Sequence, residues 1–175
     1  MSAPAALANS ALVESSPPSQ HQTLRPTEEA YSDLLAAFNY FNEALFEGRL
    51  SQPLITLARK PGMLGAFCPN RFRNADGDIA HEIILNPHYL KQNSDIDSLS
   101  TLVHEMVHQW REEFGPAAKP KKSGGYHDTV WADRMEEIGL MPSDTGLPGG
   151  KRIGPKVTHY IIEGGPFDLS VRTLM

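Results

Sequence analysis

The chain has 175 residues, which is enough for one domain with its own hydrophobic core. Hydrophobic residues make up 40% and charged residues 21% of the sequence, a balance that excludes disordered and fibrous proteins. The formal net charge of −5 argues against a surface built to bind nucleic acid. The single cysteine, Cys68, excludes an intramolecular disulfide and a thiolate-rich zinc site.

The first 26 residues are rich in alanine, serine and proline, and we expect them to form a flexible tail. They contain no basic stretch followed by an apolar run, so no secretory signal is predicted. An apolar segment of about 18 residues, which could span a membrane, occurs nowhere in the sequence. These features predict a cytoplasmic protein without a membrane partner.

A first helix is predicted to begin after Pro26, with Thr27 as its N-cap and Glu28 and Glu29 in its first turn. Apolar residues recur at helical spacing along it, and Gly48 marks its end. The predicted buried face consists of Tyr31, Leu34, Leu35, Phe38, Phe41, Leu45 and Phe46.

Three strands are predicted next, at residues 54–58, 64–68 and 79–85, with a polar connection from Arg71 to Asp78. Helices before and after them indicate an α+β domain, in which a small sheet of about three to four strands packs against helices. An edge of this sheet, near 64–68 or 79–85, is a candidate for holding a substrate as an added strand. His81 and Glu82 would then be candidate site residues, although a solvent-facing strand also explains them.

The segment Thr101-Leu-Val-His-Glu-Met-Val-His-Gln-Trp110 carries the strongest chemical signal, and it continues a helix that Ser94 would cap. His104 and His108 are four residues apart, so their rings lie on one side of the helix and can bind one metal ion together. Zinc suits neutral imidazoles and prefers four ligands. Glu105 projects beside the ion, where its carboxylate can take a proton from a water that the metal activates.

A catalytic zinc needs a third protein ligand, and the sequence offers two neighbouring candidates, His127 and Asp128. His127 shares one helical stripe with Trp131, Met135 and Ile138, which should face the core and direct its ring toward the first pair. Asp128 is the alternative ligand, but it also suits the N-cap of that helix or a role in orienting an imidazole. We therefore prefer His127.

The remaining histidines fit less well. His21 lies in the tail, His81 and His88 precede the motif, and His159 falls in a predicted strand at 157–162, where we expect a structural role. The long loop between the two ligand-bearing helices contains Lys119, Lys121 and Lys122, which either contact substrate or phosphate or are simply solvated.

Residues 142–150 form a Gly/Pro-rich link before the strand at 157–162, and the last nine residues carry no clear signal. We therefore divide the chain into a tail (1–26), a domain that carries the candidate zinc site (27–141) and a C-terminal segment (142–175) whose strand packs on the same domain.

Several short motifs occur in a characteristic order. They are Phe41-Asn42, Phe46-Glu-Gly48, Leu50, Gly65-Ala-Phe-Cys-Pro69, Ile83-Ile-Leu-Asn86 and Leu102-Val-His-Glu-Met-Val-His-Gln-Trp110. Together they resemble the SprT-like zinc metalloprotease domain from about Leu34 to about Leu140. The resemblance implies a zincin-like fold in which His104, His108 and His127 bind one catalytic Zn²⁺ ion and Glu105 is the catalytic glutamate.

Two features depart from that family's pattern. The third ligand usually follows a glycine directly, whereas this chain has Gly125-Tyr126-His127. Many members also carry a four-cysteine zinc ribbon near the C-terminus, which a chain with one cysteine cannot form.

The sequence thus predicts a zinc-dependent peptidase that acts on a protein or peptide, with Tyr126 as a candidate to stabilise the oxyanion. The resemblance further implies substrates associated with DNA, as in DNA–protein crosslink repair, although the net charge of −5 does not support DNA binding. Two alternatives are a scaffold protein with a structural zinc and a DNA-associated factor that acts without cleavage.

Overall fold

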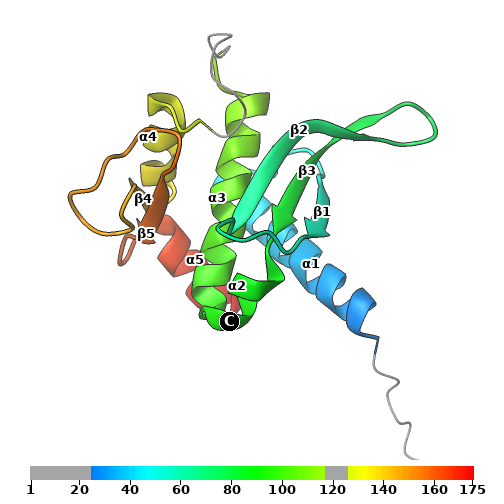
Figure 1. Cartoon of the computed structure of the whole chain (residues 1–175), viewed down its shortest axis with the longest axis horizontal. Helices are drawn as coiled ribbons and strands as arrows, with labels where there is room; N and C mark the ends of the chain where they lie inside the picture. The colour runs from blue at the N-terminus through cyan, green and yellow to red at the C-terminus, as the bar shows by residue number, and fades with distance from the viewer. Residues whose placement is uncertain (1–24, 117–125) are drawn as a thin grey trace, which may run out of the picture.

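The computed structural model describes residues 25–116 and 126–175. A central helix separates a three-stranded sheet on one side from a two-stranded sheet on the other (Figure 1). The elements are α1 (Pro26–Phe46), β1 (Leu54–Leu57), β2 (Gly65–Arg73), β3 (Ile79–Leu85), α2 (Pro87–Gln92), α3 (Asp95–Glu113), α4 (Thr129–Glu137), β4 (Leu140–Ser143), β5 (Thr158–Ile161) and α5 (Pro166–Leu174). This arrangement confirms the predicted α+β class. Among the described helices, none is long and apolar enough to cross a membrane.

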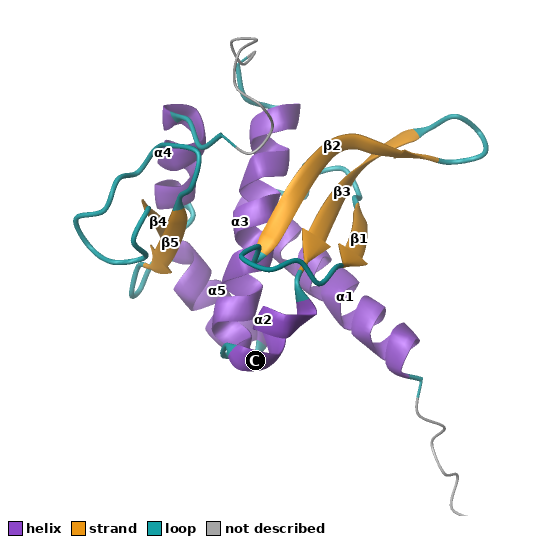
Figure 2. Cartoon of the chain, in the orientation of Figure 1, coloured by secondary structure: helices purple, strands orange, loops and turns teal. Residues whose placement is uncertain are grey.

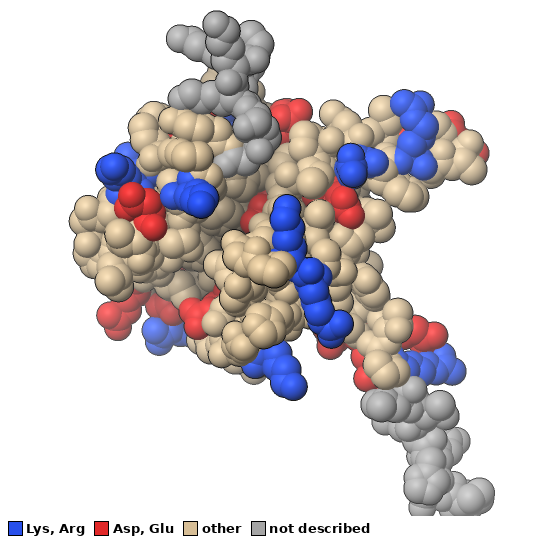
Figure 3. Space-filling model, in the orientation of Figure 1, with Lys and Arg blue, Asp and Glu red and all other residues tan. Residues whose placement is uncertain are grey.

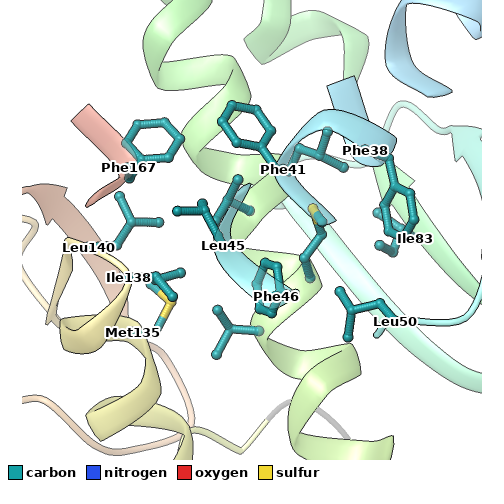
Figure 4. Close-up of a cluster of buried hydrophobic side chains, with 14 of the residues drawn as sticks. Phe38, Phe41, Leu45, Phe46, Leu50, Ile83, Met135, Ile138, Leu140 and Phe167 are labelled. Atoms are coloured by element: carbon teal, nitrogen blue, oxygen red, sulfur yellow. The ribbon is translucent and has the colours of Figure 1, made fainter. Parts of the chain in front are cut away.

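Helix α3 is the central element. Ser94 caps it as predicted, because its hydroxyl oxygen accepts a hydrogen bond from the backbone N–H of Asp97 at 3.1 Å. The apolar residues in the middle of α3 (Leu102, Val103, Met106 and Val107) are covered by the elements on both sides, and α1 and α5 pack behind it. Figure 4 shows the core in which these elements meet, with Phe41, Ile83 and Phe167 brought together from α1, β3 and α5.

The three-stranded sheet has the order β1-β3-β2. β3 is parallel to β1 and antiparallel to β2. Because β3 is the central strand, β2 forms one edge of the sheet, and this strand lies over α3. The strand β2 continues to Arg73, where the sequence predicted a connection from Arg71 onward. After a shift in register past Cys68, Phe72 pairs with Ala80 and Arg73 with Ile79. Residues 69–79 thereby form an arm that projects from the body of the molecule, hereafter the β2–β3 arm (Figure 2).

Two predictions for α1 are wrong. The helix begins at Pro26 and its N-cap is Arg25, because proline has a suitable φ and no N–H to leave unpaired in the first turn. Thr27 therefore lies inside the helix. Tyr31 and Leu35 are each 40% exposed rather than buried, because the N-terminal half of α1 extends beyond the elements it would pack against (Figure 1).

The C-terminal segment contains more regular structure than the sequence indicates. β4 lies at the start of the predicted Gly/Pro-rich link and pairs with β5, so the predicted strand near 157–162 belongs to a separate two-stranded sheet. α5 occupies the residues for which no element was predicted. Phe167 anchors it in the core, stacked on Phe41 at a ring-centroid distance of 5.6 Å.

Candidate metal centre

Three histidine rings from two helical regions meet beside α3. His104 and His108 lie one turn apart on α3, and His127 lies two residues before α4 begins. One ring nitrogen from each of the three lies within 4.8 Å of the others, and the Nε2 atoms of His104 and His127 are 3.3 Å apart. The structure thus brings together all three histidines that the sequence proposed as ligands.

The ring of His127 is fixed by Gly154. The backbone N–H of each residue donates to the carbonyl oxygen of the other at 3.0 Å, forming an isolated β-bridge. The Nδ1 atom of His127 is also 3.0 Å from the Gly154 carbonyl oxygen, so Nδ1–H is the donor. This bond leaves the unprotonated Nε2 facing His104, as a metal ligand requires.

Trp131 packs against all three rings. Its indole is completely buried, stacks on His108 at 5.1 Å between ring centroids and meets His127 edge to face at 4.3 Å. It also contacts His104 edge to face at 4.9 Å. Trp131 therefore faces inward, as the spacing predicts, but His127 precedes α4 and reaches the same side from the segment before the helix.

Burial favours the neutral form of all three imidazoles. Burial lowers the pKa of His108 to about 3, with a further contribution from neighbouring His127. Burial also lowers the pKa of His127, and burial together with the adjacent histidines lowers the pKa of His104 well below its ordinary value. Neutral imidazoles are the form that binds metals, so no proton has to leave before an ion binds. Three such nitrogens on one centre fit the donor chemistry of zinc.

Asp128, the alternative ligand, makes other contacts. Its carboxylate caps α4 by accepting the backbone N–H of Trp131 at 2.9 Å. It also forms an ion pair with Arg111, whose terminal nitrogen lies 2.8 Å from Oδ2. Asp128 thus has the N-cap role that is its alternative to metal binding.

Glu105 lies next to the histidine group but is not part of it. Its side chain is buried against Gly65 of β2, where a Cβ atom added to this glycine would come within 2.8 Å of the Glu105 Oε1. Burial raises the pKa of this carboxyl to about 8.

A pocket of about 560 Å³ opens onto these side chains. Its floor is α3, with His104, Glu105 and His108, one wall is residues 62–68, and the other is residues 155–159. The volume lies in the usual range for ligand sites. The acid and the histidines therefore share one accessible cavity between β2 and the segment before β5.

The sequence profile of the SprT-like family matches residues 34–159, which include the sheet, α3, His127 and β5. The chain belongs to the SprT-like family. Neither the comparison with curated proteins nor the comparison with solved structures gives a significant match. The α+β fold of this SprT-like chain is accordingly zincin-like, and its group of three histidines could hold a metal ion.

The other candidates of the sequence analysis lie apart from this centre. The Nδ1 of His81 accepts a hydrogen bond from Asn70, and its Nε2 lies 3.4 Å from Glu113. Glu82 accepts a hydrogen bond from Thr56, and exposed His88 contacts Gln92. Within the described part of the chain, Tyr126 does not line the pocket. The tail residue His21 and the loop lysines Lys119, Lys121 and Lys122 lie outside the described residues.

His159 was predicted to be structural, but its position at the site was not predicted. It lines the pocket, and its Nδ1 lies 3.1 Å from the Nδ1 of His104. The alternation of β5 identifies the face on which it lies but gives no indication that this face meets α3.

Proposed function

We propose that this SprT-like protein is a zinc-dependent metallopeptidase, in which His104, His108 and His127 hold one zinc ion and Glu105 is the general base. The observation that carries the proposal is the position of Glu105. Its carboxyl lines the same pocket as the three rings, yet it stands outside the group that would bind the ion. A structural zinc site has no need of such an acid.

The bound zinc would supply Lewis-acid activation of a water and of the substrate carbonyl. The positive charge of the ion would favour the carboxylate form of Glu105 against the effect of burial. Glu105 would then accept the proton of that water and later deliver it to the leaving amine. The close approach of Gly65 leaves the acid little room to turn away from the pocket. Trp131 and Gly154 would keep the ligand rings in place during the reaction.

The edge of β2 is the proposed binding place for the substrate backbone. β3 is paired on both sides by β1 and β2, so the predicted alternative at 79–85 has no free edge. Residues 65–68 of β2 line the pocket beside Glu105. An extended peptide added there would pass across the catalytic residues, with its side chains free to enter the cavity.

Action on DNA-associated proteins stays a prediction from the resemblance. Figure 3 shows Lys and Arg side chains on the β2–β3 arm and across the middle of the visible face, with Asp and Glu between them. Arg71 and Arg73 lie on the arm. Cleavage of a DNA-binding protein, measured with and without DNA over a range of salt concentrations, tests this part of the proposal.

The decisive experiment compares Glu105→Gln with Glu112→Gln, an exposed glutamate of the same helix. We expect both variants to fold and to bind one zinc per chain. Glu105→Gln should lose cleavage of an unfolded protein substrate, whereas Glu112→Gln should cleave like the wild type. If wild-type protein binds one zinc and cleaves nothing, or if Glu105→Gln is fully active, the proposal is wrong and a structural zinc becomes the better interpretation.

A further inference from the structure

His159 connects strand β5 to the first metal-binding candidate. Its ring lies against the ring of His104 with 5.2 Å between centroids, and the two Nδ1 atoms face each other at 3.1 Å. On its other side, the Nε2 of His159 lies 2.9 Å from the hydroxyl oxygen of Ser100. His159 therefore spans two residues of α3 that are one turn apart.

The hydrogen-bond partners determine where each proton lies. Ser100 donates its hydroxyl proton to the carbonyl oxygen of Asp97 at 2.8 Å, so its oxygen must accept from His159. The ring proton of His159 is therefore on Nε2, which leaves a lone pair on Nδ1. Because two facing nitrogens share one proton, the proton between the rings belongs to the Nδ1 of His104.

This arrangement selects one tautomer of His104. With Nδ1 protonated, Nε2 carries the lone pair, and Nε2 is the atom that faces His127 at 3.3 Å. A histidine whose Nε2 carried the proton could not bind an ion at that place until the proton moved.

We propose that His159 is a positioning residue, which holds His104 as its Nδ1–H tautomer and so keeps Nε2 ready to bind the metal. The inference rests on the proposed zinc site and assigns to His159 no contact with the substrate. It gives His159 the role that the Gly154 carbonyl has for His127. The short segment from Gly154 to His159 thus supports two of the three metal-binding candidates from outside.

Three substitutions of His159 separate its two hydrogen bonds. In His159→Asn the amide oxygen can stand where Nδ1 stood and accept from His104, while the bond to Ser100 is lost. In His159→Gln the amide N–H can reach Ser100, but no acceptor faces His104. His159→Leu removes both bonds. His88→Asn, at an exposed histidine outside the pocket, is the matched control.

The first measurement is the zinc dissociation constant, obtained with zinc alone in competition with a chelator. We expect His159→Gln and His159→Leu to bind zinc about 10- to 100-fold more weakly, the usual cost of losing such a partner. His159→Asn should stay close to the wild type and to His88→Asn. If His159 were purely structural, its substitutions would lower the unfolding free energy of the metal-free protein. The Gln and Leu variants would then not bind zinc more weakly than the Asn variant.

The second measurement needs no substitution. Nitrogen-15 NMR of the metal-free wild type should show His104 protonated on Nδ1 and His159 protonated on Nε2. The opposite tautomer of His104, or an unchanged zinc affinity in His159→Gln, would overturn the inference. Should the wild type bind no zinc at all, the proposed function itself fails. If the wild type binds zinc and the His159 variants bind it equally tightly, only the positioning role is wrong.

Discussion

Substitution of Gly65 by alanine tests the contact between β2 and Glu105. The backbone of Gly65 lies outside the left-handed region, so alanine can adopt it. The added Cβ would nevertheless lie 2.8 Å from Oε1, 3.0 Å from Cγ and 3.2 Å from Cδ of Glu105. All three atoms belong to one buried side chain, so either the acid or the strand has to move.

The size of the effect follows from two opposing terms. Forcing an extra methyl group into a packed site costs about 1–3 kcal/mol of unfolding free energy. Replacing glycine by alanine where the backbone permits it stabilises by about 0.4–1 kcal/mol. In the wild type the clash should dominate, whereas in the Glu105→Ala background the clash is absent and Gly65→Ala should be neutral or stabilising. The expected coupling energy is about 1–3 kcal/mol.

Urea unfolding of the four proteins of this cycle, without metal, measures the coupling. Removing the metal avoids a contribution from different zinc affinities. Cleavage by Gly65→Ala should also fall by about 10- to 100-fold with one zinc still bound, because the acid is displaced from its working position. Equal changes in stability in both backgrounds would refute the proposed contact.

Three further predictions concern the metal centre. His127→Ala should lose high-affinity zinc binding whereas Asp128→Asn should keep one zinc per chain; metal analysis showing the reverse would make Asp128 the third ligand. Trp131→Ala should lower the unfolding free energy by about 3–5 kcal/mol and weaken zinc binding, because the rings lose the surface that orients them; unchanged zinc affinity would contradict this. Free zinc at one hundred times its dissociation constant should raise the unfolding free energy by about 2.7 kcal/mol in wild type and in Glu105→Gln but not in His108→Ala, and chelation should abolish cleavage reversibly.

Features encoded by neighbouring residues could be predicted from the sequence. The N-cap at Ser94 and the pairing of His104 with His108 depend only on helix geometry and on residues within one or two turns. The inward position of Trp131 follows from the apolar stripe of α4, and His127, two residues before that helix, lies on the same side. Such patterns are visible in the sequence because the interacting groups lie close together along it.

Features that depend on distant parts of the chain could not be predicted in this way. Tyr31 and Leu35 continue the apolar stripe of α1, yet within the described residues that half of the helix stays largely uncovered. α5 forms because Phe167 meets Phe41 far along the chain, and its own sequence is too short to show a clear period. The contact between His159 and His104 joins residues 55 positions apart, and only the path of β5 past α3 creates it.

The support given by residues 154–159 has a consequence for biosynthesis. A ribosome delivers His104 and His108 well before His159, 55 residues later, and Gly154 also follows His127 by 27 positions. A nascent chain that has emerged only as far as α4 would contain the three candidate metal-binding histidines. It would lack both Gly154 and His159, which contact two of their rings. With the proposed roles of Gly154 and His159, tight zinc binding should therefore begin only after residues 154–159 have been synthesised.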